Sequence, residues 1–187
     1  MSKEFETRIL EIDQEAIEKK LIELGAKKSR EILFKRTNFD FPDNRLAKDR
    51  GFIRVRDDGE KVMMAYKCHP VDDAGEFSID CTEIEFEVED MHKPEQMLLA
   101  LGLERKRYVE NTRISYQLDD ITFDIDHWPL IKPFLEIEAP TKERVMEAVA
   151  LLGYSEDDTF QGHAGDIYEK IGIDWKPIKE LTFDLEK

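Results

Sequence analysis

The chain lacks several features that would point to particular classes of protein. It has only two cysteines, Cys68 and Cys81, whose spacing matches no zinc site and which are too few for a disulfide framework, so we expect free thiols. No apolar run approaches the roughly 20 residues that span a bilayer, and the opening MSKEFETRIL contains no signal-peptide core. We therefore expect a cytoplasmic protein with no membrane partner.

Positive charge is also in deficit. The chain has 28 Lys and Arg against 43 Asp and Glu, a formal net charge of −15. This balance argues against nucleic-acid binding, although it is compatible with a local basic pocket. The 41% of hydrophobic residues is enough for a core, and no low-complexity segment, linker or repeat divides the chain. We predict a single domain over residues 1–187.

Hydrophobic periodicity predicts a strand-dominated α+β chain. Asp13 has the character of a helix N-cap and Gly25 that of a helix stop, which predicts a helix between them. Further helices are predicted at 93–102, 141–152 and 164–172, and strands at 3–12, 29–41, 51–67 (a hairpin), 80–89, 104–117, 120–127 and 132–139.

These elements suggest one particular architecture. Hairpin connections predict an antiparallel sheet, and eight strands with one apolar face can close into a barrel with helices packed outside. We place this barrel over about residues 3–155, and a C-terminal helix and tail over about 156–187.

Charged residues recur two positions apart along nearly every predicted strand. In RGFIRVRDDGEKVMMAYK, residues 50–67, Arg54 and Arg56 share one face and Lys67 lies on the returning strand. Like charges at this spacing repel unless an anion lies between them or water screens them. The other charged strand positions are Glu4, Glu6, Arg8, Glu83, Glu85, Glu87, Arg113, Asp124, Asp126, Glu136 and Glu138.

Two interpretations of this pattern compete. One is a solvated face whose cross-strand ion pairs each contribute about 0.2–1 kcal/mol. The other is a polar tunnel, in which carboxylates hold Mg²⁺ or Mn²⁺ while arginine forks and lysines bind phosphate. Repetition across six strands favours the tunnel.

Six stretches, in order, resemble the signatures of the CYTH family, also called triphosphate tunnel metalloenzymes. EFETR resembles the ExExK motif, the segment 38–56 resembles YFDTP…L…G…LRxR, and Lys67 falls at the TxK lysine. The segments 83–87 and 111–116 resemble the acidic strand and KxRxxY, while Asp124, Asp126 and FLEIE resemble D…FxEIE. The resemblance spans roughly residues 3–139 and implies an eight-stranded closed tunnel that acts on a small-molecule triphosphate with Mg²⁺ or Mn²⁺.

The resemblance also implies a role for each charged position. The implied metal ligands are Glu4, Glu6, Glu136 and Glu138, with contributions from Glu83, Glu85, Glu87, Asp124 and Asp126. The implied substrate ligands are Arg8, Arg54, Arg56, Lys67, Arg107 and Arg113. The catalytic set comprises Glu4, Glu6, Arg54, Arg56, Lys67, Arg113, Glu136 and Glu138.

Three departures from the family pattern bear on the substrate. Arg8 and Asn111 stand where the motifs have lysine, and Ala65 stands where they have threonine. Asn111 removes one cationic phosphate contact unless another residue supplies it. The candidates are Lys106, Arg107 and Lys132.

Three functions stay open at this level. Water attacking the γ-phosphorus makes a triphosphatase, which we favour because no purine-reading set is evident. A ribose 3′-oxygen attacking the α-phosphorus makes a class IV adenylyl cyclase that releases cyclic AMP and pyrophosphate. The third is a polyphosphate- or nucleotide-binding module without turnover, and a homodimer is an open alternative to a monomer.

Overall fold

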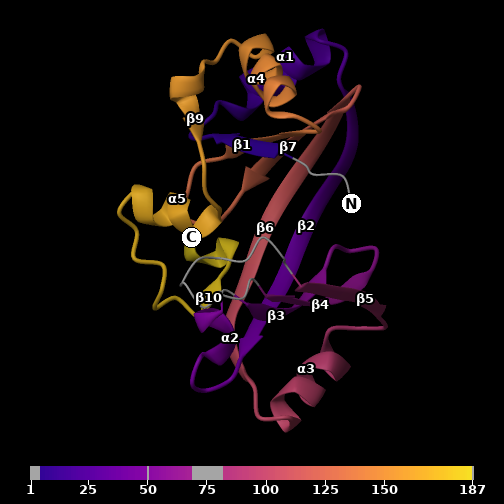
Figure 1. The fold of residues 1–187 in the computed structure, drawn as a ribbon, viewed down its shortest axis with the longest axis vertical. Coiled ribbons are helices and arrows are strands. Elements are labelled where there is room, and N and C mark those ends of the chain that lie inside the picture. The colour runs from indigo at the N-terminus through magenta and orange to yellow at the C-terminus, as the bar shows by residue number, and fades with distance from the viewer. Residues whose placement is uncertain (1–4, 50, 69–81, 187) are drawn as a thin grey trace. The chain divides into compact units, whose positions relative to one another are not determined.

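The computed structural model describes residues 5–49, 51–68 and 82–186, and in them it has a strand-dominated α+β fold (Figure 1). The strands are β1 (Phe5–Ile9), β2 (Lys27–Asp40), β3 (Phe52–Asp57), β4 (Val62–Cys68), β5 (Thr82–Val88), β6 (Glu104–Leu118), β7 (Ile121–His127), β8 (Phe134–Ala139), β9 (Thr159–Phe160) and β10 (Glu180–Leu181). The helices are α1 (Gln14–Glu23), α2 (Arg45–Lys48), α3 (His92–Ala100), α4 (Lys142–Leu151) and α5 (Ala164–Lys170), with 3-10 turns at Glu156–Asp158 and Phe183–Glu186.

The predicted elements are confirmed, and three short ones were not predicted. The strands from β1 to β8 and the helices α1, α3, α4 and α5 all lie where periodicity placed them. The unpredicted elements are α2, β9 and β10, of two to four residues each. Segments this short contain too little of a repeat for periodicity to identify them.

The strands form one ten-stranded sheet in the order β5-β4-β3-β2-β6-β7-β8-β1-β9, and β10 pairs with β6. The strands β3, β4 and β5 are antiparallel to their neighbours among themselves. The neighbouring strands β6, β7, β8, β1 and β9 are likewise antiparallel, while β10 runs parallel to β6. In the described residues no pairing joins the two ends of this order, so the closed eight-stranded barrel is not confirmed. Closure therefore stays a prediction, and the described residues contain ten strands where the sequence predicts about eight.

The chain divides into two compact units, which we describe separately. Unit 1 takes in Met1–Ile32, Asn111–Pro177 and Phe183–Lys187. Unit 2 takes in Leu33–Glu110 and Ile178–Thr182.

In unit 1, the helices α1 and α4 pack on one face of the strands β1, β7 and β8 (Figure 1). Asp13 caps α1 as predicted, because its carboxylate accepts from the Ala16 N–H at 3.1 Å. Gly25 follows that helix with φ +87°, a conformation that glycine adopts without strain. Along β7 the apolar Phe123 and Ile125 belong to this core. The residues between and beyond them, Asp124 and Asp126, therefore point to the opposite face of the sheet.

In unit 2, α3 packs on the sheet face that carries Val55 and Phe39, and Leu98 of the helix completes this core. The buried carboxylate of Asp40 accepts from the N–H groups of Phe41, Leu46 and Ala47 at 2.6, 3.0 and 2.9 Å. One carboxylate thus holds both the turn after β2 and the start of α2.

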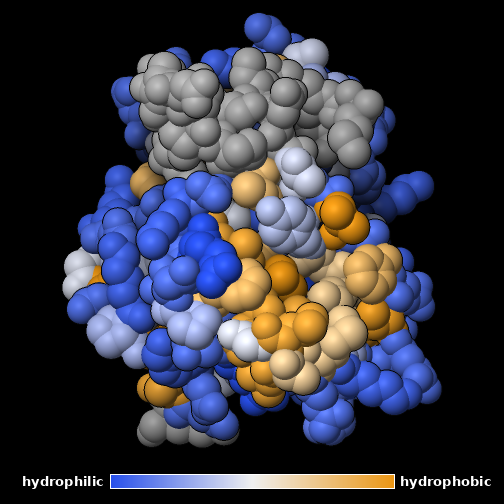
Figure 2. Space-filling view, turned by 60° about the horizontal axis from the view of Figure 1, so that its bottom comes forward, coloured by the Kyte–Doolittle hydropathy of each residue, from blue (hydrophilic) through white to orange (hydrophobic). Residues whose placement is uncertain are grey.

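Apolar side chains also remain exposed in unit 2. Figure 2 shows an apolar area surrounded by polar side chains on the side of the molecule that it faces. The exposed large hydrophobic residues of unit 2 include Ile84, Phe86 and Met97, each at least half accessible.

None of the helices in the described part of the chain is both long and apolar enough to cross a bilayer.

Candidate functional site

Three glutamates of unit 1 converge on one point. Glu6 and Glu138 are direct partners across the pair β1–β8, and Glu136 lies two residues earlier on β8. One carboxylate oxygen from each lies within 4.8 Å of the others. Glu136 is buried and Glu6 is exposed, so the cluster opens on one side to solvent. Convergent carboxylate oxygens fit the preference of Mg²⁺ and Mn²⁺ for hard ligands.

Arg8 lies between two of these carboxylates. Its Nη2 is 2.5 Å from Glu136 and 3.0 Å from Glu6, and the Arg8 side chain is 10% exposed. Such charge-assisted contacts fix the positions of both carboxylates. The structure places the Arg8 guanidinium against the acidic cluster, and its predicted role as a substrate ligand stays a prediction.

A second set of carboxylates surrounds Arg113 on the same face of unit 1. The guanidinium binds Asp126 through Nε at 3.0 Å and Nη2 at 2.5 Å, Asp124 through Nη1 at 2.6 Å, and Glu136 at 3.1 Å. Burial alone would lower the Arg113 pKa, but these carboxylates, Asp126 first, raise it above its ordinary value. Burial raises the pKa of Asp126, and Arg113 opposes that effect. Glu136 therefore links this set to the glutamates that could bind a metal.

Two neutral side chains complete the network around Arg113. The Ser115 hydroxyl donates to Asp124 at 2.5 Å, and the Asn111 amide donates to Asp126 at 3.2 Å. Asn111 thus occupies the position of the family's lysine as a hydrogen-bond donor to a carboxylate. Through this hydrogen bond Asn111 helps to hold the Asp126 carboxylate in place.

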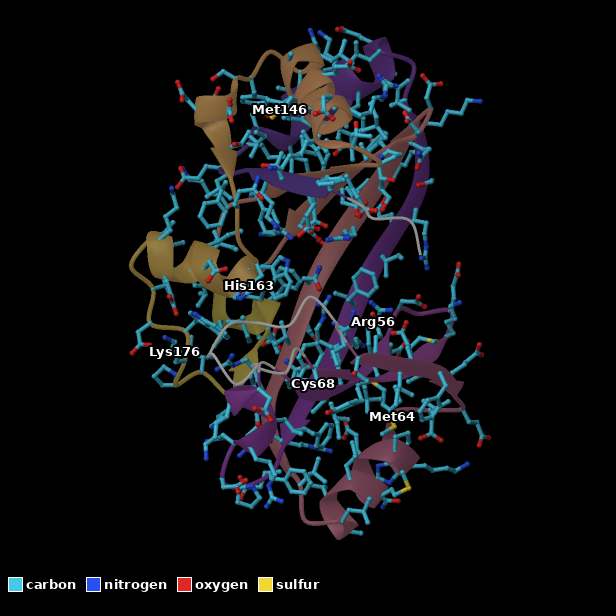
Figure 3. All side chains as sticks on the ribbon, in the orientation of Figure 1. Arg56, Met64, Cys68, Met146, His163 and Lys176 are labelled. Carbon is cyan, nitrogen blue, oxygen red and sulfur yellow. The ribbon has the colours of Figure 1, made fainter. Side chains whose placement is uncertain are left out.

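Unit 2 carries three of the predicted cations on one sheet face, which we call the basic face. Arg54 and Arg56 alternate with the buried Val55 on β3. Figure 3 shows Arg56 on the opposite side of the strands from Met64, which lies toward α3. Lys67 of β4 is 2.7 Å from its cross-strand partner Glu83 on β5.

The charges of the basic face are only partly balanced by the described carboxylates. Arg56 Nη2 lies 3.5 Å from Glu85 Oε1, a long contact for an ion pair. Burial first, and then Arg56, lower the pKa of Arg54. The Nε atoms of Arg54 and Arg56 are buried, and each is without a hydrogen-bond acceptor among the residues described.

Two further residues of this face were missed by the sequence reasoning. Arg36 is the antiparallel partner of Arg56, and Asn38 is the partner of Arg54. A signal for both was present, because the apolar Phe39 marks the opposite face of the same strand.

Other predicted residues lie elsewhere or outside the described ranges. Glu4 is outside them, and Glu87 is an exposed residue of β5 on the same strand face as Glu83 and Glu85. Arg107 donates through Nε to the Ile178 carbonyl at 2.9 Å and lines a cavity of about 670 Å³ in unit 2. Its role in substrate binding stays a prediction.

The two lysines considered as replacements for the missing cation are engaged with carboxylates. Lys106 lies 2.9 Å from Glu104, and Lys132 lies 3.0 Å from Glu11. Lys132 is 70% exposed at its side chain, so its contact adds little stability.

One comparison with known proteins identifies a family. The model of the CYTH domain matches residues 2–160 of the chain. No curated protein matches the sequence.

Solved structures resemble the chain over most of its length. The protein PH1012 of Pyrococcus horikoshii OT3 has a TM-score of 0.65 at 25% identity, with 84% of this chain and 94% of that chain covered. A "putative adenylate cyclase" of Vibrio parahaemolyticus has a TM-score of 0.70 at 14% identity, with 89% and 97% covered. A "putative adenylyl cyclase" of Hippeastrum, described as having a dominant triphosphatase activity, has a TM-score of 0.61 at 15% identity, with 91% and 97% covered. At these identities the last two establish a shared fold.

Proposed function

The chain belongs to the CYTH domain family, and from that premise we propose that it is a divalent-metal-dependent enzyme that hydrolyses a small-molecule triphosphate. The candidate substrates are inorganic tripolyphosphate, thiamine triphosphate and a nucleoside triphosphate. The observation that carries the proposal is the cluster of Glu6, Glu136 and Glu138, whose oxygens converge within 4.8 Å.

The acidic residues of unit 1 are proposed to hold Mg²⁺ or Mn²⁺. Glu6, Glu136 and Glu138 would be the ligands, and Glu4, which lies outside the described residues, is proposed as a further ligand from its place in the motif. A bound divalent ion supplies charge neutralisation at phosphate oxygens and lowers the pKa of coordinated water. Arg8 and Arg113 both contact Glu136 and would fix its orientation, as partners of metal ligands commonly do.

The basic residues of unit 2 are proposed to bind phosphate. Arg54 and Arg56 present guanidinium donors that match phosphate oxygens, and Lys67 adds a point charge. Because the transition state of phosphoryl transfer spreads negative charge over oxygens, fixed cations of this kind lower the barrier. The buried Nε atoms of the two arginines have donor capacity that a phosphate can use.

Product analysis separates this proposal from its rivals. The chain is incubated with tripolyphosphate, thiamine triphosphate and ATP in Mg²⁺ or Mn²⁺, and phosphate, pyrophosphate and cyclic AMP are measured. We expect phosphate release that a chelator stops. Cyclic AMP in equal amount to pyrophosphate would assign a cyclase instead, and tight binding without any product would assign a binding module.

Three expectations from the sequence accompany the proposal and stay predictions. They are the cytoplasmic location, the absence of nucleic-acid and membrane partners, and the alternative of a homodimer.

A further inference from the structure

Arg36 adds a third guanidinium to the basic face of unit 2. It is the direct antiparallel partner of Arg56, and opposite residues in a strand pair project to the same side of the sheet. We propose that Arg36 is a phosphate ligand, and that Arg36 and Arg56 bind the same phosphate group of the substrate. This inference rests on the proposed function and deepens it, because it names the two arginines that bind one phosphate group of the substrate.

A buried aromatic ring orients both side chains. The guanidinium carbon of Arg36 lies 5.3 Å from the centroid of Phe34, and that of Arg56 lies 5.5 Å from the same centroid. Phe34 is 9% exposed, so its ring is itself fixed by packing. Cation–π contacts with one fixed ring hold two guanidiniums near each other before any ligand binds. A ligand then meets less of the entropic cost of ordering long side chains.

The pair of arginines brings two like charges to the same side of the sheet. Like charges directly opposite each other on neighbouring strands destabilise a sheet. Arg54 lies two residues from Arg56 on the same face and adds to this repulsion. Arg56 Nη2 also lies 3.5 Å from Glu85 Oε1, a long contact for an ion pair. A phosphate dianion bound between Arg36 and Arg56 would offset the repulsion with two charge-assisted forks.

The test measures the affinity of the full chain for inorganic tripolyphosphate by calorimetric titration without metal. Arg36→Ala is expected to weaken binding at least about tenfold, the loss typical of charge-assisted hydrogen bonds. Lys35→Ala is the matched control, because Lys35 is the exposed neighbour on β2 and its removal changes the net charge equally. Binding by Arg36→Ala that equals binding by Lys35→Ala would overturn the inference.

A double-mutant cycle tests whether the two arginines share one phosphate. If they do, Arg36→Ala combined with Arg56→Ala loses less affinity than the product of the two single losses. Strictly multiplicative losses would reject the shared phosphate. Arg36→Lys, which keeps the charge but not the fork, should recover part of the affinity and shows that the strand is intact. A wild-type chain that binds tripolyphosphate but releases no phosphate would contradict the proposed function alone, whereas one that does not bind would contradict both.

Discussion

Arg113 donates two hydrogen bonds to Asp126. Its Nε donates to one carboxylate oxygen at 3.0 Å, and its Nη2 donates to the other at 2.5 Å. Asp126 is 1% exposed, so this parallel fork is its main source of charge compensation. The same Nη2 reaches Glu136 at 3.1 Å. One guanidinium therefore joins the buried Asp126, whose role as a metal ligand stays a prediction, to Glu136 of the acidic cluster.

Removing Arg113 should destabilise the fold. We expect Arg113→Met to lower the free energy of unfolding by about 3 kcal/mol, because it leaves buried carboxylates without a counter-charge. Arg113→Lys should cost less, since it retains the charge and loses the fork. Urea denaturation measures both. Equal stability of Arg113→Met and the wild-type chain would show that the carboxylates find other compensation.

Asp40 should matter for stability rather than for chemistry. It is 4% exposed and accepts three backbone N–H groups, so Asp40→Ala leaves those donors without their acceptor. We expect a loss of about 2–4 kcal/mol in the free energy of unfolding, with Asp40→Asn intermediate. The control is Asp43→Ala, an exposed carboxylate in the same turn whose contact is with Arg45. A similar cost for Asp43→Ala and Asp40→Ala would refute the capping role.

Asp40 also shows what the sequence could and could not reveal. Period-two alternation located β3, β7 and β8 because each has one apolar and one charged face. The short helix α2 has no such repeat. Its start depends instead on a carboxylate six positions before Leu46 in the chain. Proximity of this kind is created by the turn and is not encoded in periodicity.

The candidate site was predicted to a similar degree. Glu6, Glu136 and Glu138 could be grouped from motif order, and the structure brings them together. The contacts of Arg8 with carboxylates depend on cross-strand register, which a sequence pattern does not give. Arg36 was passed over for the same reason, because only the β2–β3 register shows that it faces Arg56.

Tyr116 makes stability depend on pH in the alkaline range. Burial, and then the hydrogen bond that its hydroxyl donates to Glu18 at 2.7 Å, raise the pKa of Tyr116 to about 12 from an ordinary value of 10.0. Above pH 10.0 the unfolded chain loses this proton first, so the free energy of unfolding should fall as the pH rises toward about 12.

The variant Tyr116→Phe tests that dependence. Near neutral pH it should cost about 1 kcal/mol, the loss of one hydrogen bond, and it should flatten the decline between pH 10 and about 12. Urea denaturation at several alkaline pH values gives both quantities. Tyr108→Phe is a useful comparison, because burial also raises the pKa of Tyr108 to about 12. A decline of unchanged slope in Tyr116→Phe would assign the effect to other groups.

The most direct test of the proposed metal site is the binding of Mn²⁺ to the full chain, measured by electron paramagnetic resonance, in the wild type and in Glu138→Gln. Glu138→Gln leaves the bonds of Arg8 and Arg113 to Glu136 in place, and Glu143→Gln, an exposed carboxylate of α4, is the control. We predict that Glu138→Gln weakens Mn²⁺ binding at least about tenfold while Glu143→Gln does not. Equal Mn²⁺ affinity in the wild type and in Glu138→Gln would show that Glu138 is not a metal ligand.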